Sequence, residues 1–239
     1  MGLSYFNPKI TSTMRQLLLL IAAQFILFTV SAQITYQKGY FIDNEGAKIE
    51  GLIKNIDWRN NPNSINYKGH ENDDNQTVSI EEIQEFGIYG FSKYVKADVQ
   101  LDLSSSNLNN LNYDKNPDFV ADTLFLKVLV EGTATLYGYT AKHLTRYFFK
   151  LQNSEIEPLI FKKYRLEGDK VRSNNQFKQQ LHNSLSCQGL SSINISGVEY
   201  KKKDLEKYFV DYNNCVGSCL LYTSPSPRDQ RGSRMPSSA

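Results

Sequence analysis

Alternating apolar and polar residues between positions 124 and 164 constrain the fold more than any other feature of this sequence. The apolar members of the first stretch fall on one face of a strand, since side chains alternate between the two faces of a β-strand. They are Leu124, Leu126, Val128 and Val130. Glu131-Gly132 then marks a turn, and residues 133–140, 144–151 and 159–164 read as three further strands. The pattern predicts an antiparallel meander with one face in a core.

Basic side chains interrupt this meander at regular positions. They are Lys127, Arg146, Lys150 and Lys162. In an antiparallel sheet one face commonly meets water while the other packs on the core. We therefore expect these four side chains to lie on a solvated face.

The preceding residues also favour short strands. Residues 40–42 and 49–56 flank Asp43-Asn44-Glu45-Gly46, which predicts a hairpin. Strands around 65–68 and 76–80 flank a polar loop, 70–75. Ser79 and Glu82 have the spacing of a capping box, so a helical turn is expected at 80–85. Residues 86–103 alternate as one long strand, and the Asn/Ser/Asp-rich segment 104–118 is expected to be a surface loop.

Helical periodicity appears only near the end of the chain. Ser173 and Gln176 form a second capping-box pattern, followed by apolar residues every four positions: Phe177, Leu181 and Leu185. A second stripe consists of Leu205, Tyr208, Phe209 and Tyr212. The fold class predicted is α+β, a hairpin-rich antiparallel meander followed by two amphipathic helices within a helical end at about 172–215.

The first 32 residues have the pattern of a secretory signal peptide. Met14 and Arg15 precede an apolar run at 17–30, and Val30-Ser31-Ala32 resembles a cleavage site. The run has 14 residues, which is shorter than the roughly 20 that a membrane-spanning helix needs. A retained membrane anchor is the alternative. Residues 1–13 are interpreted as an extension upstream of a true start at Met14.

The last 21 residues have neither strand nor helix periodicity. The words CLLYTSPSPRD, QRG and SRMPSSA resemble the translated read-through of a sequencing-library adapter. Residues 219–239 are therefore interpreted as an artefactual, disordered tail, and a natural Ser/Pro-rich tail is the alternative. The genuine body, 33–218, is expected to be one β-rich domain whose reading frame was truncated at Ser218.

Charge within this body argues against nucleic acid as a partner. Five of the 27 basic residues but only one of the 25 acidic residues lie in the two flanks, so the body is slightly acidic. The basic patch that nucleic-acid binding requires has no support from composition.

Two cysteines remain in the body, and their number suits an oxidising compartment. If Cys187 and Cys215 form a disulfide, it would join the ends of the two predicted helices. Two free buried thiols are the alternative. Cys219 belongs to the tail, so its spacing from Cys215 is not read as a metal site.

The common catalytic motifs are missing from the sequence. There is no GxxxxGK[ST], GxSxG, HExxH or CxxC pattern and no Gly-rich dinucleotide loop. The three histidines, His70, His143 and His182, are far apart, so we predict no catalytic residue, cofactor or metal. Asp73 and Asp74 offer oxygen ligands for calcium but lack the spacing and glycine of a calcium loop, which favours a solvated hairpin tip.

Trp58 and Arg59, beside a turn, suggest a binding platform, because Trp and Arg concentrate at interfaces. A core Trp that holds the hairpin is the alternative.

Several segments resemble a family of uncharacterised exported proteins of the Bacteroidota, flavobacteria especially. They are KGYFIDNEG, IEGLIKNIDWRNNP, EFGIYGFSKYVKA, LFLKVLVEGTATLY and YKKKDLEKYFVDYNNC, and the likeness covers essentially all of 33–218. In that family such a segment precedes an outer-membrane β-barrel. The resemblance implies export to the periplasm or outer membrane but supplies no catalytic residue.

Two functional hypotheses follow. The first is a non-enzymatic envelope module that acts beside an outer-membrane barrel and binds an envelope component, either protein or glycan. The second is a periplasmic enzyme that uses Asp98, Asp102, Asp114 or His143. A true active site would gather titratable side chains in one concave pocket, whereas scattered positions would count against an enzyme.

Overall fold

A computed structural model describes residues 35–56, 58–187 and 195–217. The chain divides into two compact units, 1–35 and 36–239, and every described residue except Thr35 belongs to the second. The expected signal peptide and the expected foreign tail lie outside the described residues.

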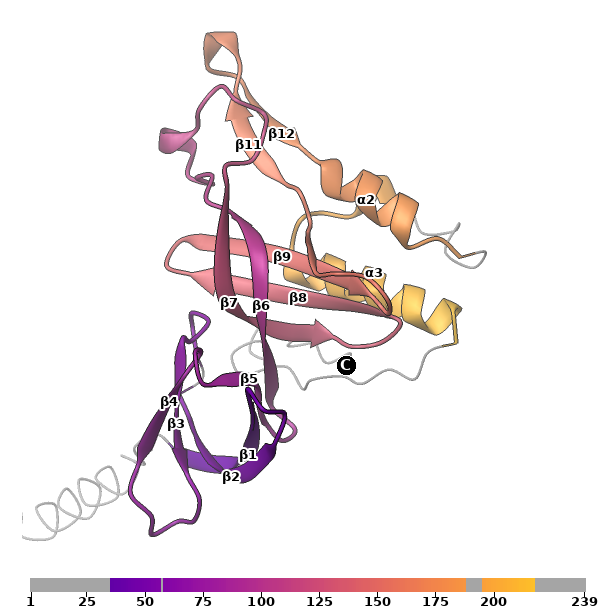
Figure 1. The fold of residues 1–239 in the computed structure, drawn as a ribbon. Helices are drawn as coiled ribbons and strands as arrows, with labels where there is room; N and C mark the ends of the chain where they lie inside the picture. Colours follow the sequence, from indigo (N-terminus) through magenta and orange to yellow (C-terminus); the bar gives the residue numbers. More distant parts are fainter. Residues whose placement is uncertain (1–34, 57, 188–194, 218–239) are drawn as a thin grey trace, which may run out of the picture. The chain divides into compact units, whose positions relative to one another are not determined.

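The described part is an α+β structure, as predicted, with a mostly antiparallel ten-stranded sheet and two helices (Figure 1). The sheet strands are β1 (Thr35–Asp43), β2 (Lys48–Asn55), β3 (Ser64–Lys68), β4 (Gln76–Ser79), β5 (Ile83–Ile88), β6 (Ser92–Asp102), β7 (Phe119–Val130), β8 (Ala134–Ala141), β9 (Leu144–Leu151) and β10 (Glu157–Pro158). Their order in the sheet is β10-β9-β8-β7-β6-β5-β1-β2-β3-β4. A separate two-stranded sheet pairs β11 (Lys162–Arg165) with β12 (Val171–Asn174).

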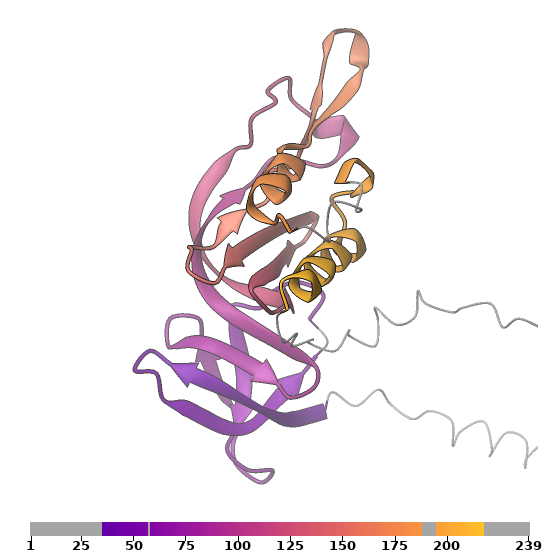
Figure 2. The ribbon, with the colours of Figure 1, turned by 90° about the vertical axis from the view of Figure 1, so that its right-hand side faces the viewer.

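The helices are α2 (Gln176–Ser184) and α3 (Lys202–Cys215), with short 3-10 turns η1 (Leu108–Asn110), η2 (Glu167–Asp169) and η4 (Ile195–Gly197). Figure 2 shows α2 and α3 on one side of the strands β7 to β9. None of the described helices is long and apolar enough to cross a membrane.

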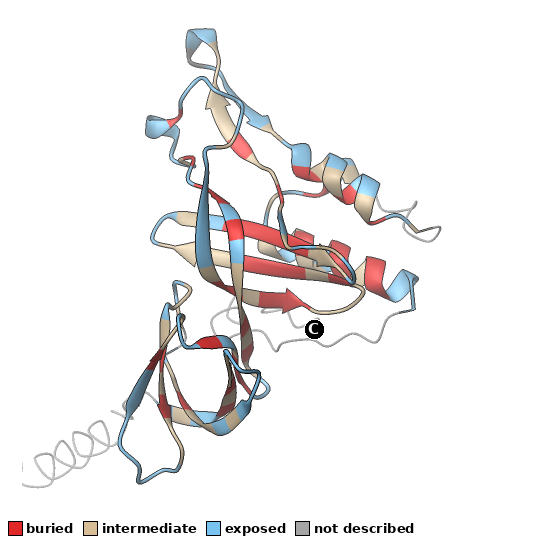
Figure 3. Ribbon diagram, viewed as in Figure 1, coloured by how far each residue is buried: buried red, intermediate tan, exposed pale blue. Residues whose placement is uncertain are grey.

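Three apolar clusters hold the described residues together (Figure 3). The first packs the faces of α2 and α3 against β7, β8 and β9, and all four predicted apolar residues of the second helix are buried in it. The second lies among β1 to β7. The third lies within the curl of β6 to β9.

Strands β6 and β7 carry apolar residues on both faces. Tyr94 and Phe125 point into the second cluster, whereas Val99 and Leu126 point into the third. These strands therefore contribute to two cores at once. The alternating residues Val95, Ala97, Val99 and Leu101 lie on the face of β6 that packs in the third cluster.

A bulge in β7 changes the face on which its last residue lies. Val128 pairs with Tyr137 and Val130 pairs with Leu136, so Leu129 is the extra residue of the longer strand. Val128 stays in the third cluster, but Val130 turns into the first. The expectation that Val130 shares a face with Val128 is wrong, because a bulge shifts the alternation by one residue.

The expected long strand at 86–103 is also wrong. A turn at Tyr89 and Gly90 divides it into β5 and β6, with the Phe91 N–H bonded to the Ile88 carbonyl at 3.0 Å. Gly90 has φ of +70°, a conformation that glycine adopts without strain. Alternation continues on both sides of the turn, which conceals the break in the sequence.

Both capping-box expectations fail, each for a local reason. The Ser79 N–H does donate to the Glu82 carboxylate at 2.7 Å, which lowers the pKa of Glu82, but the chain enters β5 directly at Ile83 and forms only a turn. Ser173 lies in β12, and α2 begins at Gln176, whose N–H donates to the Asn174 side chain at 3.1 Å.

The expected fourth strand of the meander, 159–164, does not form as one strand of the large sheet. Only β10 pairs with β9, together with a bond from the Leu159 N–H to the Tyr147 carbonyl at 2.9 Å. The chain then leaves the sheet, and β11 pairs with β12.

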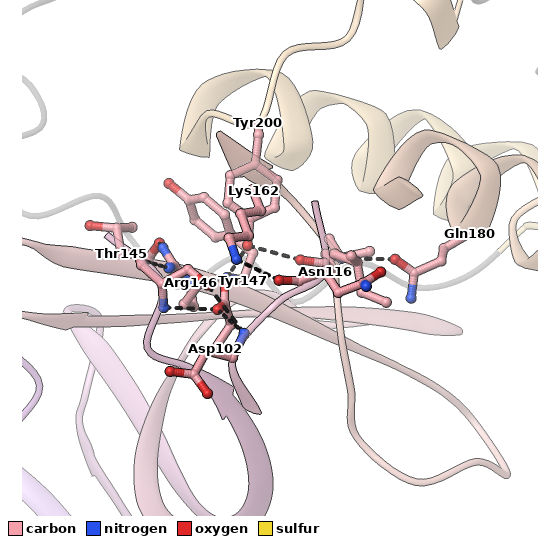
Figure 4. A network of polar contacts seen from close by, with 12 residues as sticks. Asp102, Asn116, Thr145, Arg146, Tyr147, Lys162, Gln180 and Tyr200 are labelled. Atoms are coloured by element: carbon pink, nitrogen blue, oxygen red, sulfur yellow. Dashed lines mark hydrogen bonds and ion pairs between the residues drawn. The ribbon is translucent and has the colours of Figure 1, made fainter. Parts of the chain in front are cut away.

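Arg146 and Lys162 are buried, so the expectation that all four basic side chains lie on a solvated face is wrong. Figure 4 shows both side chains in a network of polar contacts. The Arg146 Nε faces the Asp102 carboxylate at 3.0 Å, and both side chains are 6% exposed. Arg146 also donates to the carbonyls of Thr145 and Ser104, and Lys162 donates to the carbonyl of Asn116.

The same carboxylate fixes the ends of the loop between β6 and β7. Asp102 Oδ1 accepts the N–H groups of Ser104 at 2.9 Å and of Asp118 at 3.0 Å. The segment 104–118 is largely exposed, as expected. Its first and last residues, however, donate hydrogen bonds to a carboxylate that belongs to a buried ion pair.

Candidate functional site

The described residues form an open pocket of about 450 Å³ around Lys93, which we call the Lys93 pocket. Its lining residues come from β1, β2, β5, β6, the turn between β5 and β6, and the residue that follows β7. They are Tyr40, Ile42, Lys48, Glu85, Ile88, Tyr89, Gly90, Phe91, Ser92, Lys93 and Glu131. The volume lies within the range of small-molecule sites, roughly 300 to 1,000 Å³.

A missing side chain at Gly87 positions the first tyrosine. Tyr40 and Gly87 are direct partners across β1 and β5, and a Cβ on Gly87 would come within 2.9 Å of the Tyr40 ring. The ring can therefore lie against the strand, where its hydroxyl donates to Glu85 Oε1 at 2.6 Å. Burial, together with this hydrogen bond and the Glu85 charge, raises the pKa of Tyr40 well above its ordinary value, so the phenol is neutral.

Lys93 lies between two carboxylates. Its Nζ is 2.9 Å from Glu131 Oε1 and 3.4 Å from Glu85 Oε2, and the three side chains are between 19% and 31% exposed. Burial opposes the charge of Lys93, but the bond to Glu131 and the charge of Glu85 outweigh it and raise the pKa of this ammonium. The centre of the pocket is therefore a triad in which one ammonium lies between two carboxyl groups.

The rim of the pocket is aromatic. The rings of Tyr40 and Tyr89 are 5.4 Å apart and inclined by 34°, and Tyr89 is 49% exposed. Lys48 Nζ lies 4.5 Å from the Tyr40 ring centre and 5.3 Å from that of Tyr89. Glu50 accepts from the Tyr89 hydroxyl at 2.6 Å and contacts Lys48 at 3.1 Å.

Ser92 supplies the one polar lining group whose hydroxyl is buried without a hydrogen-bond partner among the described residues. The residue is only 4% exposed, and its Oγ has no bond. A buried polar atom left without a partner costs about 1 to 3 kcal/mol. Ser92 pairs with Ile88 and lies on the face of β6 opposite to Lys93, so this hydroxyl points toward the side of the second cluster.

The residues proposed from the sequence for an enzyme are not brought together. Asp102 is buried in the ion pair with Arg146, Asp114 lies in the exposed loop, and His143 is exposed in the turn between β8 and β9. Asp98 accepts from the Thr123 hydroxyl at 2.6 Å and lines a second hollow of about 640 Å³ between β6, β7 and β10. The charged side chains described in that hollow are the carboxylates of Asp98, Asp122 and Glu157, and they do not form a metal-binding group in the part of the chain that the structure covers.

The proposed binding platform divides into two different environments. Trp58 is half-buried and packs edge-on against Phe86 and Tyr94, with ring centres 5.6 and 5.7 Å away, which is the arrangement of the core alternative. Arg59 is exposed beside it.

The other candidate positions occupy separate surface sites. Asp73 accepts from the backbone N–H of His70 at 2.7 Å, Asp74 is exposed in the same hairpin tip, and His182 is exposed on α2. Nothing in this arrangement joins them to the Lys93 pocket.

The structure pairs Cys187 with Cys215 in a disulfide, with Cα atoms 6.5 Å apart. Cys215 is the last residue of α3, and Cys187 follows α2 by three residues. The bond therefore connects the C-terminal ends of the two helices that cover the first cluster.

Sequence reasoning missed the pocket residues because they lie on separate strands. Tyr40, Glu85, Lys93 and Glu131 are neighbours only through the register of β1, β5 and β6 and the end of β7. The sequence signal was limited to a tyrosine and a glycine in two predicted strands, and their pairing could not be read from spacing.

Comparison with protein-family models finds no match, and no curated protein or solved structure is significantly similar to the chain. What the arrangement can do must therefore be argued from its own chemistry. The pocket offers hydrogen-bond donors and acceptors, a pair of tyrosine rings and a lysine between two carboxylates.

Proposed function

We propose that this chain is an exported, non-enzymatic binding module of the bacterial cell envelope. In this proposal it is the periplasmic N-terminal part of a protein associated with an outer-membrane β-barrel, and it holds an envelope component in the Lys93 pocket. The leader-like sequence and the family resemblance support the location. The observation that carries the binding role is the open pocket itself, which brings the Tyr40–Tyr89 ring pair beside Lys93 and its two carboxylate partners.

The charge arrangement favours binding over catalysis. Glu85 and Glu131 both contact Lys93, so the two carboxylates share one ammonium. Tyr40 is held as a neutral donor to Glu85. A general base or a nucleophile is usually activated by a strongly shifted pKa and a free line of approach to the substrate. Here the titratable groups are engaged with one another.

Binding is tested by co-sedimentation of the purified full chain with an isolated outer-membrane and cell-wall fraction. Tyr89→Ala removes an exposed ring at the rim, and Tyr113→Ala, at a 67% exposed residue in the loop 104–118, is the matched control. We expect wild type and Tyr113→Ala to sediment with the envelope and Tyr89→Ala to bind less. Equal binding of all three, or none by wild type, would overturn the proposal.

The same incubation separates a binding module from an enzyme. A non-enzymatic module releases no soluble sugar, peptide or lipid product from the envelope over time. Release of such a product by wild type, and its loss in Tyr89→Ala, would establish the periplasmic enzyme alternative instead.

Location is tested by expressing the complete reading frame in a bacterium of the Bacteroidota. We expect the protein in the periplasmic or outer-membrane fraction, shortened at its N-terminus by removal of residues up to about 32. Full-length protein in the cytoplasm would contradict export.

A further inference from the structure

We infer that Tyr40 and Tyr89 form an aromatic cage for an alkylammonium group, in which a lysine side chain of a partner protein replaces Lys48. This inference rests on the proposed binding function and names the chemistry of the ligand at the Lys93 pocket. Three features of the pocket support it: the position of the Lys48 ammonium, the exposure of that side chain, and the excess of carboxylates around it.

The first feature is the position of the Lys48 ammonium. Its Nζ lies 4.5 Å from the centre of the Tyr40 ring and 5.3 Å from that of Tyr89. A cation within about 6 Å of a ring centre is attracted by the negative face of the π system. Glu50 also contacts this Nζ, at 3.1 Å. Two ring faces and a carboxylate therefore already surround the end of a lysine side chain, and a second lysine can make the same contacts.

The second feature is the exposure of this occupant. The side chain of Lys48 is 48% exposed and that of its partner Glu50 is 65% exposed. An exposed ion pair of this kind adds little to the stability of a protein. Lys48 can therefore leave the rings for water without disturbing the core. Lys93 is only 25% exposed and contacts two carboxylates, so it stays in place when Lys48 leaves.

The third feature is the excess of carboxylates, which selects a cation. Glu50 contacts Lys48, whereas Glu85 and Glu131 both contact Lys93, so three carboxylates share two ammonium groups. One more ammonium makes the two numbers equal. An anionic ligand would meet an excess of negative charge, and a neutral ligand would have to displace Lys48 from the rings without this attraction.

NMR titration of the full chain tests the inference with defined probes. Butylammonium chloride carries the four-carbon chain and the ammonium of lysine, 1-butanol is the neutral comparison, and sodium butyrate is the anionic comparison. At constant ionic strength we expect butylammonium to shift the amide signals of Gly90 and Lys93 saturably, and the other two probes to leave them unchanged. Absence of saturation below about 100 mM butylammonium, or equal shifts with 1-butanol, would overturn the inference.

Lys48→Ala separates an exchangeable occupant from a structural lysine. Removal of the side chain that covers the rings should raise the affinity for butylammonium about three- to tenfold, because the cage is then vacant in every molecule. Lys54→Ala, in the same strand but outside the pocket, removes the same charge and is the matched control. An affinity in Lys48→Ala that is equal to or below that of wild type, or an equal gain in Lys54→Ala, would refute the exchange.

Two variants at Tyr89 test the contribution of the aromatic face. Tyr89→Phe and Tyr89→Leu both lose the hydroxyl that donates to Glu50, but only Tyr89→Phe keeps a ring. We expect Tyr89→Phe to bind butylammonium within about twofold of wild type and Tyr89→Leu to bind about fivefold more weakly. Equal affinities of the two variants would show that the ring face does not hold the cation.

Treatment of the envelope fraction distinguishes failure of this inference from failure of the proposed function. Acetic anhydride converts lysine ammonium groups to neutral amides, and protease removes proteins. We expect co-sedimentation to be lost after either treatment. Binding that survives acetylation would overturn the ammonium ligand and leave the binding module intact. Loss after acetylation but not after protease would overturn a lysine of a partner protein, and absence of binding to untreated envelope would overturn both the inference and the proposed function.

Discussion

The buried Asp102–Arg146 pair allows a prediction about stability that the structure makes quantitative. Both side chains are 6% exposed, and Arg146 Nε lies 3.0 Å from Asp102 Oδ2. Removing one member of such a pair leaves the other charge buried without its partner, which typically costs about 3 to 5 kcal/mol. The change that we consider first is Arg146→Met, which keeps most of the side-chain volume.

The two single variants should differ because their remaining partners differ. In Arg146→Met the Asp102 carboxylate still accepts two backbone N–H groups, so we expect a loss near the lower end, about 3 kcal/mol. In Asp102→Leu the Ser104 N–H loses its acceptor, the Asp118 N–H keeps only the Ser104 hydroxyl and Arg146 keeps only carbonyl partners, so the loss should approach about 5 kcal/mol.

The double variant tests the pair itself. With Asp102→Leu and Arg146→Met together, neither charge of the pair remains buried, and the main cost is the Ser104 N–H, which has lost its acceptor. We expect the double variant to lose about 2 kcal/mol, less than either single variant.

Urea unfolding of the full chain provides the assay, with circular dichroism as one probe and fluorescence of Trp58, the single tryptophan, as the other. Lys207→Met is the control, because the Lys207–Asp211 pair is on the surface and Lys207 is 73% exposed. If Arg146→Met lowered the free energy of unfolding by less than about 1 kcal/mol, or if the losses of the two single variants added up in the double variant, the reasoning that these charges are buried and energetically coupled would be refuted.

Three further predictions concern separate parts of the described structure. Asn213→Ala should cost about 2 to 4 kcal/mol in urea unfolding, because the buried amide bonds the N–H of Ala134 at 2.9 Å and its carbonyl at 2.8 Å and thereby docks α3 on β8. Reduction of the Cys187–Cys215 disulfide should lower stability by about 2 to 4 kcal/mol, measured with and without dithiothreitol, because it closes a loop with a sequence separation of 28. Burial, with the nearby Glu206 charge, raises the pKa of Tyr147 from 10.0 to about 12. The neutral phenol therefore contributes fully to the free energy of unfolding below about pH 10, and this contribution is lost as the pH rises toward 12. Tyr147→Phe should make the loss of stability at alkaline pH shallower.

Each of these predictions has its own control. Asn214→Ala changes the exposed neighbour of Asn213 and should have little effect. A Cys187→Ser, Cys215→Ser variant should match the reduced protein and no longer respond to reductant, and a continued response would contradict the assigned bond. Tyr113→Phe, at an exposed tyrosine, should not alter the alkaline slope, and equal slopes for wild type and Tyr147→Phe would contradict the Tyr147 assignment.

Alternating apolar residues predicted most of the strands, and apolar residues at helical spacing predicted both helices. Both patterns are local, because neighbouring residues in the sequence define the buried face of a strand or a helix. The stripe of Leu205, Tyr208, Phe209 and Tyr212 is buried as expected. The errors concern features that depend on distant partners. Arg146 looked like a surface residue because two of its acceptors, Asp102 and the Ser104 carbonyl, lie more than forty positions earlier in the sequence.

The candidate site was less predictable than the fold for the same reason. Trp58 was conspicuous as a residue type, yet it packs against Phe86 and Tyr94. The Lys93 pocket depends on the exact register that places Gly87 opposite Tyr40. A shift by one residue would turn these side chains to the opposite face.

The double burial of β6 and β7 has a consequence for how the described residues open to solvent. Tyr94 and Phe125 belong to one cluster, and Val99 and Leu126 belong to another, so these strands cannot be exposed without disrupting both. Their central amides should exchange with deuterium only through the rarest openings, whereas the amides of β4 at the sheet edge should exchange early. A deuterium-uptake experiment would then find one group of slowly exchanging amides that spans the two halves of the sheet, instead of two segments that open independently.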